Sequence, residues 1–268
     1  MNITFRLEQP EDYYTVEALT RDAFWDTHWG GDDVITDVHL LVSKLRRCSA
    51  LVPELNIVAM IDEEIVGHII YSKAKIVCGD GKETEVLTFG PLTVAPDFQG
   101  IGIGRKLMEH TFNIAKKLGY RAVLIFGHPD YYPRVGFRPA SEFGITASDG
   151  KSFDPFMAYP LFEGALDGIK GRFYLDDVYE SLTQEEALEF DQKFPPRPRE
   201  LFVPVSIEVL LDKLEPDARR AIEQLGIDNL NLLSTKSERE IRQLEGIDEL
   251  AVETIRKIMK EHDVKWGR

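Results

Sequence analysis

A glycine-rich segment between a strand and a helix constrains the fold of this chain more than any other feature of its sequence. Residues 86–94 have the composition of a strand, and residues 105–118 have the apolar spacing of a helix. Between them, residues 99–105 read Gln-Gly-Ile-Gly-Ile-Gly-Arg. Glycines let the backbone approach a ligand closely, and a helix N-terminus adds positive partial charge. The segment therefore predicts a backbone cradle for a phosphate or pyrophosphate.

The spacing within this loop separates the cofactor classes that use such cradles. A P-loop requires lysine directly after its last glycine, whereas Arg105 follows Gly104. A dinucleotide-binding loop requires glycine at its sixth position, which, counted from Gly100, is again Arg105. The spacing that fits is Gln-x-x-Gly-x-Gly, with Gln99 and Gly102 at its first and fourth positions. At these residues the sequence resembles the GNAT superfamily of N-acetyltransferases, in which the loop binds the pyrophosphate of coenzyme A.

A second motif lies about 30 residues downstream, at 127–137, and reads Gly-His-Pro-Asp-Tyr-Tyr-Pro-Arg-Val-Gly-Phe. It resembles the Tyr-x-x-x-Gly-Phe signature of the same family, with Tyr132 four residues before Gly136. The resemblance implies that the Tyr132 phenol lies near the sulfur of coenzyme A and protonates the leaving thiolate. A phenol with a pKa of about 10 is protonated at neutral pH, as this catalytic role requires. Tyr131 is the competing candidate.

The resemblance also implies where acetyl-CoA, the cosubstrate, would bind. The backbone of residues 92–94 would hydrogen-bond the pantetheine arm, and an N–H near Val94 would polarise the thioester carbonyl. A bulge in this strand would splay it from the strand at 121–126 and open a slot for the cofactor. The cofactor-binding residues expected on this basis are Leu92, Thr93, Val94, Gln99, Gly100, Ile101, Gly102, Ile103, Gly104 and Arg105. No metal site is expected.

The acceptor side of the reaction is left open by the sequence. The acceptor would be an amine of a small molecule or peptide whose identity the sequence does not give. Candidates for the base that takes the amine proton are His39, Glu83, Glu85, His128 and Asp130, or a water relay. Candidates for lining an acceptor pocket are Trp25, Trp29, Phe143 and Tyr159. Aromatic residues at this density belong more often to the core, so the pocket stays a hypothesis.

The order of elements predicts an α/β fold. Strand-like runs lie at 3–7, 56–61, 65–71, 74–78, 86–94 and 121–126, and helical spacing at 11–24, 37–47 and 105–118. Strands that meander first and then form a strand–helix–strand unit imply a mixed central sheet flanked by helices, as in the GNAT fold. The resemblance covers about residues 2–175 and looks like the bacterial group of predicted acetyltransferases. We therefore expect the acetyltransferase domain at 1–175.

The C-terminal part of the chain has a different sequence pattern from the part before it. Prolines at 195–198 predict a linker, so residues 176–200 are interpreted as an extension and Pro-rich linker. From 201 to 268 the pattern is one of short amphipathic helices. This stretch resembles the C-terminal domain of the bacterial RNA polymerase alpha subunit, an all-helical fold with helix-hairpin-helix elements. Where relatives that bind DNA present a turn to phosphate, this chain has Asp248 and Glu249, so we expect a protein-interaction or packing module without useful DNA affinity.

Charge and composition exclude several classes of partner. The net charge of −14 opposes nonspecific binding to nucleic acid and to anionic membranes. The sequence has no long apolar run or secretory signal and only two cysteines, which favours a cytoplasmic protein and no membrane partner. A homodimer is left open. The alternative function is an acetyl-CoA-sensing regulatory or adaptor protein whose C-terminal module binds a transcription partner; an enzyme is favoured because a sensor would not need Tyr132.

Overall fold

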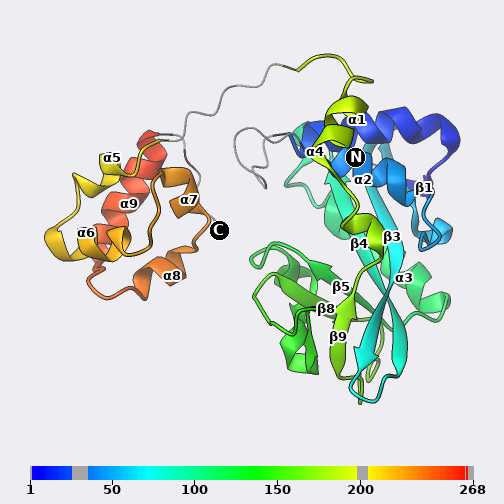
Figure 1. Ribbon diagram of the computed structural model, residues 1–268. Helices are drawn as coiled ribbons and strands as arrows, with labels where there is room; N and C mark the ends of the chain where they lie inside the picture. Colours follow the sequence, from blue (N-terminus) through cyan, green and yellow to red (C-terminus); the bar gives the residue numbers. More distant parts are fainter. Residues whose placement is uncertain (1, 26–35, 198–204, 263, 265–268) are drawn as a thin grey trace. The chain divides into compact units, whose positions relative to one another are not determined.

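A mixed sheet organises the first of two compact units, residues 1–197. The computed structural model describes residues 2–25, 36–197, 205–262 and 264. In these residues the strand order is β1-β2-β3-β4-β5-β8-β6, with β9 pairing with β3 and β7 (Figure 1). The strands are β1 Thr4–Leu7, β2 Ile57–Ile61, β3 Glu64–Cys78, β4 Glu83–Val94, β5 Ala122–Phe126, β6 Arg138–Pro139, β7 Ile145–Thr146, β8 Phe156–Pro160 and β9 Gly171–Tyr174.

The sheet is mixed because two of its strand pairs are parallel. β4 and β5 run parallel, as do β7 and β9, and the other pairs are antiparallel. A parallel pair requires a crossover, which α3 (Ile103–Lys117) supplies between β4 and β5. The other helices of this unit are α1 Tyr13–Ala23, α2 Val38–Leu45 and α4 Gln184–Asp191. The predicted α/β fold with a mixed central sheet and flanking helices is confirmed.

The longest strand differs from the prediction. The sequence pattern predicted separate strands at 65–71 and 74–78, whereas β3 is continuous over Glu64–Cys78. Ser72 and Lys73 interrupt the apolar run, which is why a break was expected. Ser72 is nevertheless fully buried, and its hydroxyl lies 2.9 Å from the Tyr179 hydroxyl, so a satisfied polar side chain replaces an apolar one in the strand.

A bulge separates β4 from its neighbour β5. The register between β3 and β4 shifts by one residue between the pairs Ile69–Leu92 and Tyr71–Phe89, so β4 carries an extra residue near Gly90. The ladder between β4 and β5 consists of a single register pair, Leu87 with Val123. Beyond that pair the two strands diverge, and the predicted splaying of β4 from the strand that follows α3 is confirmed.

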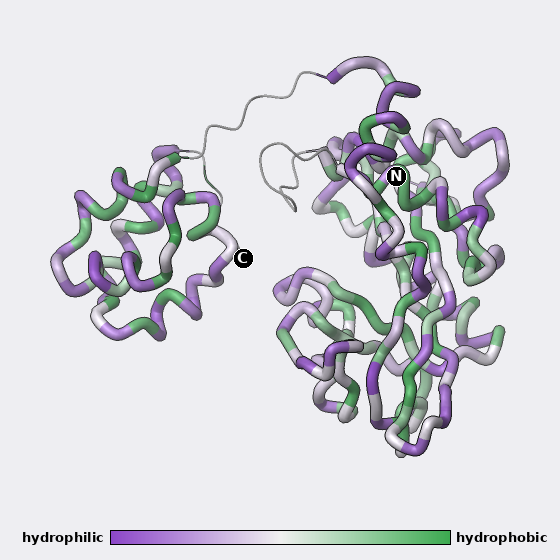
Figure 2. Tube along the Cα trace, viewed as in Figure 1, coloured by the Kyte–Doolittle hydropathy of each residue, from purple (hydrophilic) through white to green (hydrophobic). Residues whose placement is uncertain are grey.

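The main core lies between the sheet and α3. Hydrophobic residues run along the central strands (Figure 2). The face of α3 that carries Ile103, Leu107 and Met108 is buried against them, at the spacing expected of an amphipathic helix. Tyr71 of β3 is fully buried, and its hydroxyl lies 2.8 Å from that of Thr111 on α3, which fixes the helix across the sheet. This packing holds the N-terminus of α3 beside the end of β4.

Residues 176–197 belong to the first unit. Phe190 and Phe194 are buried against Leu40 of α2, and Asp191 pairs with Arg21 of α1. Phe194 stands at the start of the segment interpreted as a linker, yet it belongs to this small core because a large aromatic side chain gains from leaving water. The division between the two units accordingly falls at 197/198, later than the expected end of the acetyltransferase domain at 175.

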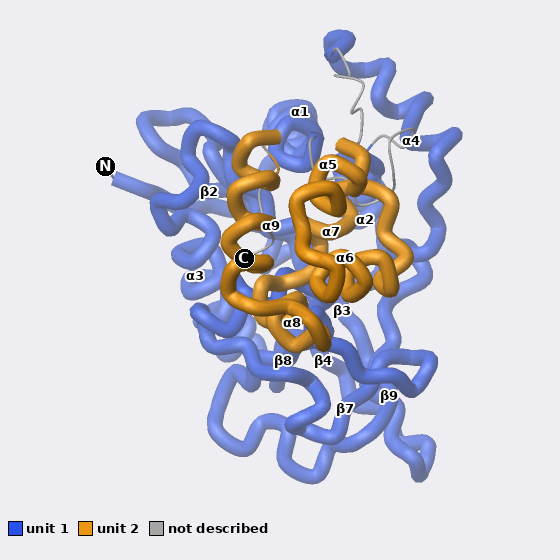
Figure 3. Tube along the Cα trace, turned by 90° about the vertical axis from the view of Figure 1, so that its left-hand side faces the viewer, with its two compact units in different colours: residues 1–197 blue, residues 198–268 orange. Residues whose placement is uncertain are grey.

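The second unit, residues 198–268, is helical in its described part (Figure 3). Its helices are α5 Glu208–Leu211, α6 Pro216–Glu223, α7 Leu230–Ser234, α8 Glu238–Arg242 and α9 Glu249–Glu261. Hydrophobic and hydrophilic residues alternate at short intervals along it, as expected of amphipathic helices around one core (Figure 2). In the described parts of both units, no helix is long and apolar enough to cross a membrane.

Candidate active site

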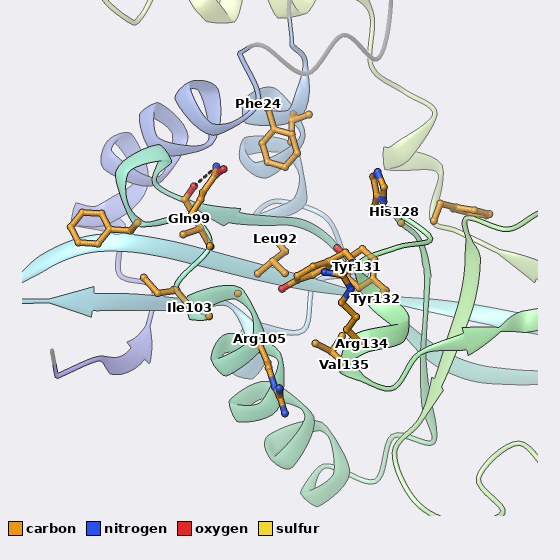
Figure 4. Close-up of a pocket in the computed structure, with 18 of the residues that line it drawn as sticks. Phe24, Leu92, Gln99, Ile103, Arg105, His128, Tyr131, Tyr132, Arg134 and Val135 are labelled. Carbon is orange, nitrogen blue, oxygen red and sulfur yellow. Dashed lines mark hydrogen bonds between the residues drawn. The ribbon is translucent and has the colours of Figure 1, made fainter. Parts of the chain in front are cut away.

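A cleft of about 1040 Å³ lies in the first unit where β4 and β5 diverge (Figure 4). One wall comes from the end of β4 and the start of α3, and another from the end of β5 and the turn that follows it. The ends of α1, α2 and α4 close the remaining side. The lining residues are Phe24, Thr36, Asp37, Val38, Leu92, Val94, Phe98, Gln99, Gly100, Gly102, Ile103, Gly104, Arg105, Phe126, Gly127, His128, Tyr131, Tyr132, Arg134, Val135 and Gln184.

The glycine loop presents backbone donors to this cleft. Gly100 and Gly102 have φ angles of +78° and +89°, a conformation that residues with a side chain rarely adopt. Gly102 is the N-cap of α3 and offers no side chain to the first N–H groups of the helix. These N–H groups lack intrahelical partners and lie at the positive end of the helix dipole. An anion such as a diphosphate would satisfy both features.

Gln99 ties this loop to the end of β4. Its side-chain amide donates a hydrogen bond from Nε2 to the Val94 carbonyl oxygen, at 3.1 Å. Figure 4 shows the side chain beside the start of the loop. The bond fixes where the strand stops and the glycine segment begins, so the role of the glutamine in this structure is to position backbone.

The register of β4 directs alternate backbone groups into the gap. The Ala95 N–H donates to the Val66 carbonyl of β3 at 2.9 Å. Because an antiparallel ladder alternates every second residue, Thr93 also bonds toward β3, and the N–H groups of Leu92 and Val94 point toward the splayed edge. Beyond the Leu87–Val123 pair, that edge has no strand partner in the described part of the chain and can bind an extended ligand.

Eight of the ten expected cofactor-binding residues line the cleft: Leu92, Val94, Gln99, Gly100, Gly102, Ile103, Gly104 and Arg105. The other two lie elsewhere. Thr93 is fully buried, and its hydroxyl is 3.2 Å from that of Thr20 on α1. Ile101 is 51% exposed on the outside of the loop.

Tyr132 lies at the inner side of the turn after β5. Its ring packs against Phe89 and Phe137, with ring centroids 6.0 and 5.4 Å apart. A Cβ on Gly127 would lie 2.3 Å from Tyr132 Cε2, so this close approach requires glycine at position 127. Burial raises the pKa of Tyr132 above its usual range, and the neighbouring Tyr131 raises it further. The phenol therefore keeps its proton at neutral pH.

Tyr131 has a different environment. It is 38% exposed, and its hydroxyl lies 3.2 Å from the position that a Cβ on Gly104 would occupy. Burial raises its pKa, while Arg105 lowers it. Tyr131 thus faces the first turn of α3, where the loop offers its N–H groups, and Tyr132 faces the interior beneath β4.

Of the candidate bases, His128 lines the cleft. Its Nδ1 accepts a hydrogen bond of 3.3 Å from the Asp130 N–H. The side chains of Glu83 and Glu85 are exposed and pair with lysines of β3, outside the cleft. His39 is fully buried beside Asp191, and Asp130 is not among the lining residues.

The aromatic acceptor pocket suggested by the sequence does not form in the described residues. Trp25 stacks with the Arg21 guanidinium, Phe143 with that of Arg138, and Tyr159 with the ring of Phe112. None of these three lines the cleft, and Trp29 lies outside the described residues. Each of these three aromatic side chains packs against a neighbouring residue instead of lining the cleft.

Other residues, which the sequence analysis did not single out as site residues, also line the cleft. They are Phe24, Thr36, Asp37, Val38, Phe126 and Gln184. Asp37 lies at the start of a predicted helix and Phe126 at the end of a predicted strand, so the sequence placed both at the ends of elements. No sequence pattern indicated that Gln184 would line the cleft, because it is far from both motifs in sequence.

Comparison with known proteins agrees with this geometry. Residues 16–137 match the family model described as the acetyltransferase (GNAT) family. The first unit is therefore similar to this family over these residues. The chain is 27% identical over 168 residues to the uncharacterized N-acetyltransferase YhbS of Escherichia coli, and this match covers 62% of this chain and 92% of that protein.

Further relatives are similar over different lengths. The uncharacterized N-acetyltransferase YjhQ of Escherichia coli is 32% identical over 101 residues, which span 38% of this chain and 55% of that protein. A crystal structure of Escherichia coli YhbS with CoA has a TM-score of 0.59 at 24% identity, covering 69% of this chain and 95% of that one. A Brucella melitensis GNAT acetyltransferase with acetyl-CoA has a TM-score of 0.53 at 25% identity, covering 66% and 98%. The GNAT fold of the first unit is therefore confirmed.

Proposed function

We propose that the first unit transfers the acetyl group of acetyl-CoA directly to an amine of a small molecule or peptide. The observation that carries this proposal is the junction of a splayed β4 edge with the glycine-capped N-terminus of α3 in one cleft. An extended thioester with a diphosphate at one end matches both parts. Two solved GNAT structures similar to this chain hold CoA or acetyl-CoA, which supports the same cosubstrate here.

The proposed reaction assigns a task to each part of the cleft. Backbone N–H groups of Gly100–Arg105 bind the diphosphate, and the Leu92 and Val94 edge holds the pantetheine arm. The Val94 N–H polarises the thioester carbonyl. The amine nitrogen attacks the carbonyl carbon, the C–S bond breaks, and the thiolate takes the phenolic proton of Tyr132. The amine proton leaves to water in the cleft or to His128, the candidate base that lines it.

For the helical unit we propose a protein-interaction or packing role, in keeping with its resemblance to the RNA polymerase alpha C-terminal domain. Three of its arginines are paired with neighbouring carboxylates: Arg219 with Glu223, Arg242 with Glu249, and Arg256 with Glu238. Guanidinium groups neutralised in this way attract phosphate weakly. No observation supports the alternative function, an acetyl-CoA sensor that recruits a transcription partner.

Cofactor binding tests the proposal first. Gly102→Asp adds a negative charge where the diphosphate would lie, and Gly102→Ala has the same strained backbone without the charge. We expect calorimetry to show acetyl-CoA affinity reduced by more than about tenfold in Gly102→Asp relative to Gly102→Ala. Thiol release from acetyl-CoA with a panel of amines then tests the transfer. Equal acetyl-CoA affinity in the two folded variants would show that the diphosphate does not bind at this loop.

A further inference from the structure

Asp37 brings a carboxylate to the cleft, and the other charged residues that the structure describes in its lining are Arg105, Arg134 and the titratable His128. Figure 4 shows both arginines beside α3, on the other side of the tyrosines from Phe24. Asp37 comes from the start of α2, and α1, which ends at Phe24, packs against that helix. The cleft therefore has cationic side chains near the glycine loop and an anionic one among the helix ends.

The Asp37 carboxylate has no partner among the residues that the structure describes. An aspartate before a helix normally accepts a hydrogen bond from an N–H of the first turn. Here the N-cap residue Asp37 makes no such bond, and the Val38 N–H donates to the Thr36 hydroxyl oxygen instead, at 3.4 Å. Within residues 2–25, 36–197, 205–262 and 264, Asp37 forms no ion pair and no side-chain hydrogen bond. Helix formation therefore does not account for a carboxylate at this position.

The surroundings of this carboxylate suit a cation. Phe24 and Val38, which adjoin the start of α2 in the fold, line the cleft together with Asp37. Apolar walls strengthen the attraction between opposite charges by excluding water, and aromatic rings attract cations through their faces. The net charge of −14 adds a long-range attraction for positively charged ligands.

We propose that the acceptor carries a second cationic group, an ammonium or guanidinium, which Asp37 binds while the free amine attacks the thioester. This inference rests on the proposed acetyl transfer and names the class of acceptor for it. Asp37 would bind one ammonium group of such a dication through its charge. That ammonium lowers the pKa of the other one, because like charges joined by a short chain repel each other, so the second amine loses its proton more readily. Asp37 is then a specificity-determining residue that contacts the acceptor.

The test compares diaminoalkanes of three to six carbons with the monoamines of equal length, for example 1,4-diaminobutane with 1-aminobutane. Each pair differs by a single ammonium group. We expect thiol release by the wild-type chain to show kcat/KM at least about tenfold higher for the best diamine than for its monoamine. The advantage should lie in KM and should shrink as salt is added, because it is electrostatic.

Asp37→Asn keeps the shape of the side chain and removes its charge. It should bring the diamine and monoamine values of kcat/KM close together by raising KM for the diamine. Glu163→Gln is the matched control, because this exposed glutamate lies outside the cleft and removes the same charge from the whole chain. The control should keep the diamine preference.

Three results would overturn the inference: no preference for diamines in the wild type, a preference that survives Asp37→Asn, or no turnover of any diamine by a chain that binds acetyl-CoA. An equal loss of kcat for both amines in Asp37→Asn would instead assign Asp37 to the chemical step and also overturn it. Failure of the wild-type chain to bind acetyl-CoA in calorimetry is a separate outcome, which defeats the proposed transfer itself.

Discussion

Neighbouring side chains in the turn after β5 have opposite surroundings. Tyr131 points its hydroxyl at the first turn of α3, and Tyr132 packs its ring against Phe89 and Phe137. Burial raises the pKa of both phenols, so either could donate a proton at neutral pH. The family signature favours Tyr132, and its catalytic role stays a prediction.

Single-atom substitutions can decide between the two tyrosines. Tyr132→Phe removes the hydroxyl and keeps the ring packing, so we expect turnover to fall by about 10²-fold with acetyl-CoA affinity nearly unchanged. Tyr131→Phe is the matched control and should retain most of the activity. Steady-state rates and calorimetry on both variants provide the measurement. Loss of turnover in Tyr131→Phe alone would transfer the proton-donor role to Tyr131.

The parts of the site that could be predicted are those formed by residues close together in the sequence. The glycine loop was predicted because its conformation needs particular residues at fixed spacing, and Gly100 and Gly102 do adopt positive φ angles. Asp37 and Gln184 reach the cleft from elements distant in sequence, with no spacing rule that links them to the loop. The aromatic pocket was left as a hypothesis beside the core alternative, since an aromatic side chain in the sequence gives no indication of whether it faces a cleft or the core.

At the scale of elements, α4 is held against α1 and α2 by a buried polar contact. Asp191 accepts hydrogen bonds from the Arg21 guanidinium at 2.5 and 3.0 Å, and His39 Nε2 lies 3.3 Å from the same carboxylate. The His39 ring also packs against Phe190 and Phe194. The start of α4 lines the cleft, so the contact that anchors this helix also positions one wall of the site.

This contact should weaken in mild acid. Burial lowers the pKa of His39 to about 4, an effect that Asp191 opposes and Arg21 reinforces. An exposed histidine has a pKa of about 6.5, so between these values the undocked state binds more protons than the docked one. The stability of the contact is therefore full above about pH 6.5 and is lost as the pH falls toward 4.

Hydrogen exchange measures this effect directly. We expect residues 184–194 to lose protection between pH 7 and pH 5, after correction for intrinsic exchange rates, and the loss should be smaller in His39→Gln. His110→Gln is the control, because His110 stacks on Phe5 of β1, away from α4, and this variant should keep the pH dependence. Equal protection of 184–194 at both pH values in the wild type would contradict the prediction.

Strands and helices were predicted more reliably than their ends. Apolar periodicity located α1, α2 and α3 within a few residues, because burial of one face dictates that spacing. β3 was split in the prediction because a polar residue breaks the apolar run. The partner that satisfies Ser72 is Tyr179, more than a hundred residues away, and no local pattern reveals it.

At the scale of the whole molecule, the chain has two units with separate hydrophobic cores. The second unit is built around Leu210, Ile222, Leu233 and Ile255, which are all fully buried. Turns there are tight: a Cβ on Gly246 would lie 2.9 Å from the Asp217 carbonyl oxygen, so only glycine fits. The two-part organisation was expected from the change in composition, whereas the docking of Phe194 needed the structure.

Separate cores imply separate folding. We expect a fragment of residues 198–268 to melt cooperatively and a fragment of residues 1–197 to bind acetyl-CoA as the full chain does. The helical fragment should not bind duplex DNA, since it has 14 acidic and 11 basic residues after position 200 and Arg219, Arg242 and Arg256 are paired with carboxylates. Fluorescence anisotropy at low salt is the measurement. Micromolar binding that disappears as salt rises would reverse the proposed role of this unit.

The two ends of the cleft between β4 and β5 would recognise their ligands through different groups, the backbone at one end and side chains at the other. Backbone groups at Leu92 and Val94 are the same whatever side chains the strand carries, so a ligand held by them tolerates sequence change as long as the register with β3 is kept. The opposite end of the cleft is built from side chains, where every substitution alters shape or charge. A lineage of such proteins could therefore exchange one acceptor for another by point substitution and keep its cofactor unchanged throughout.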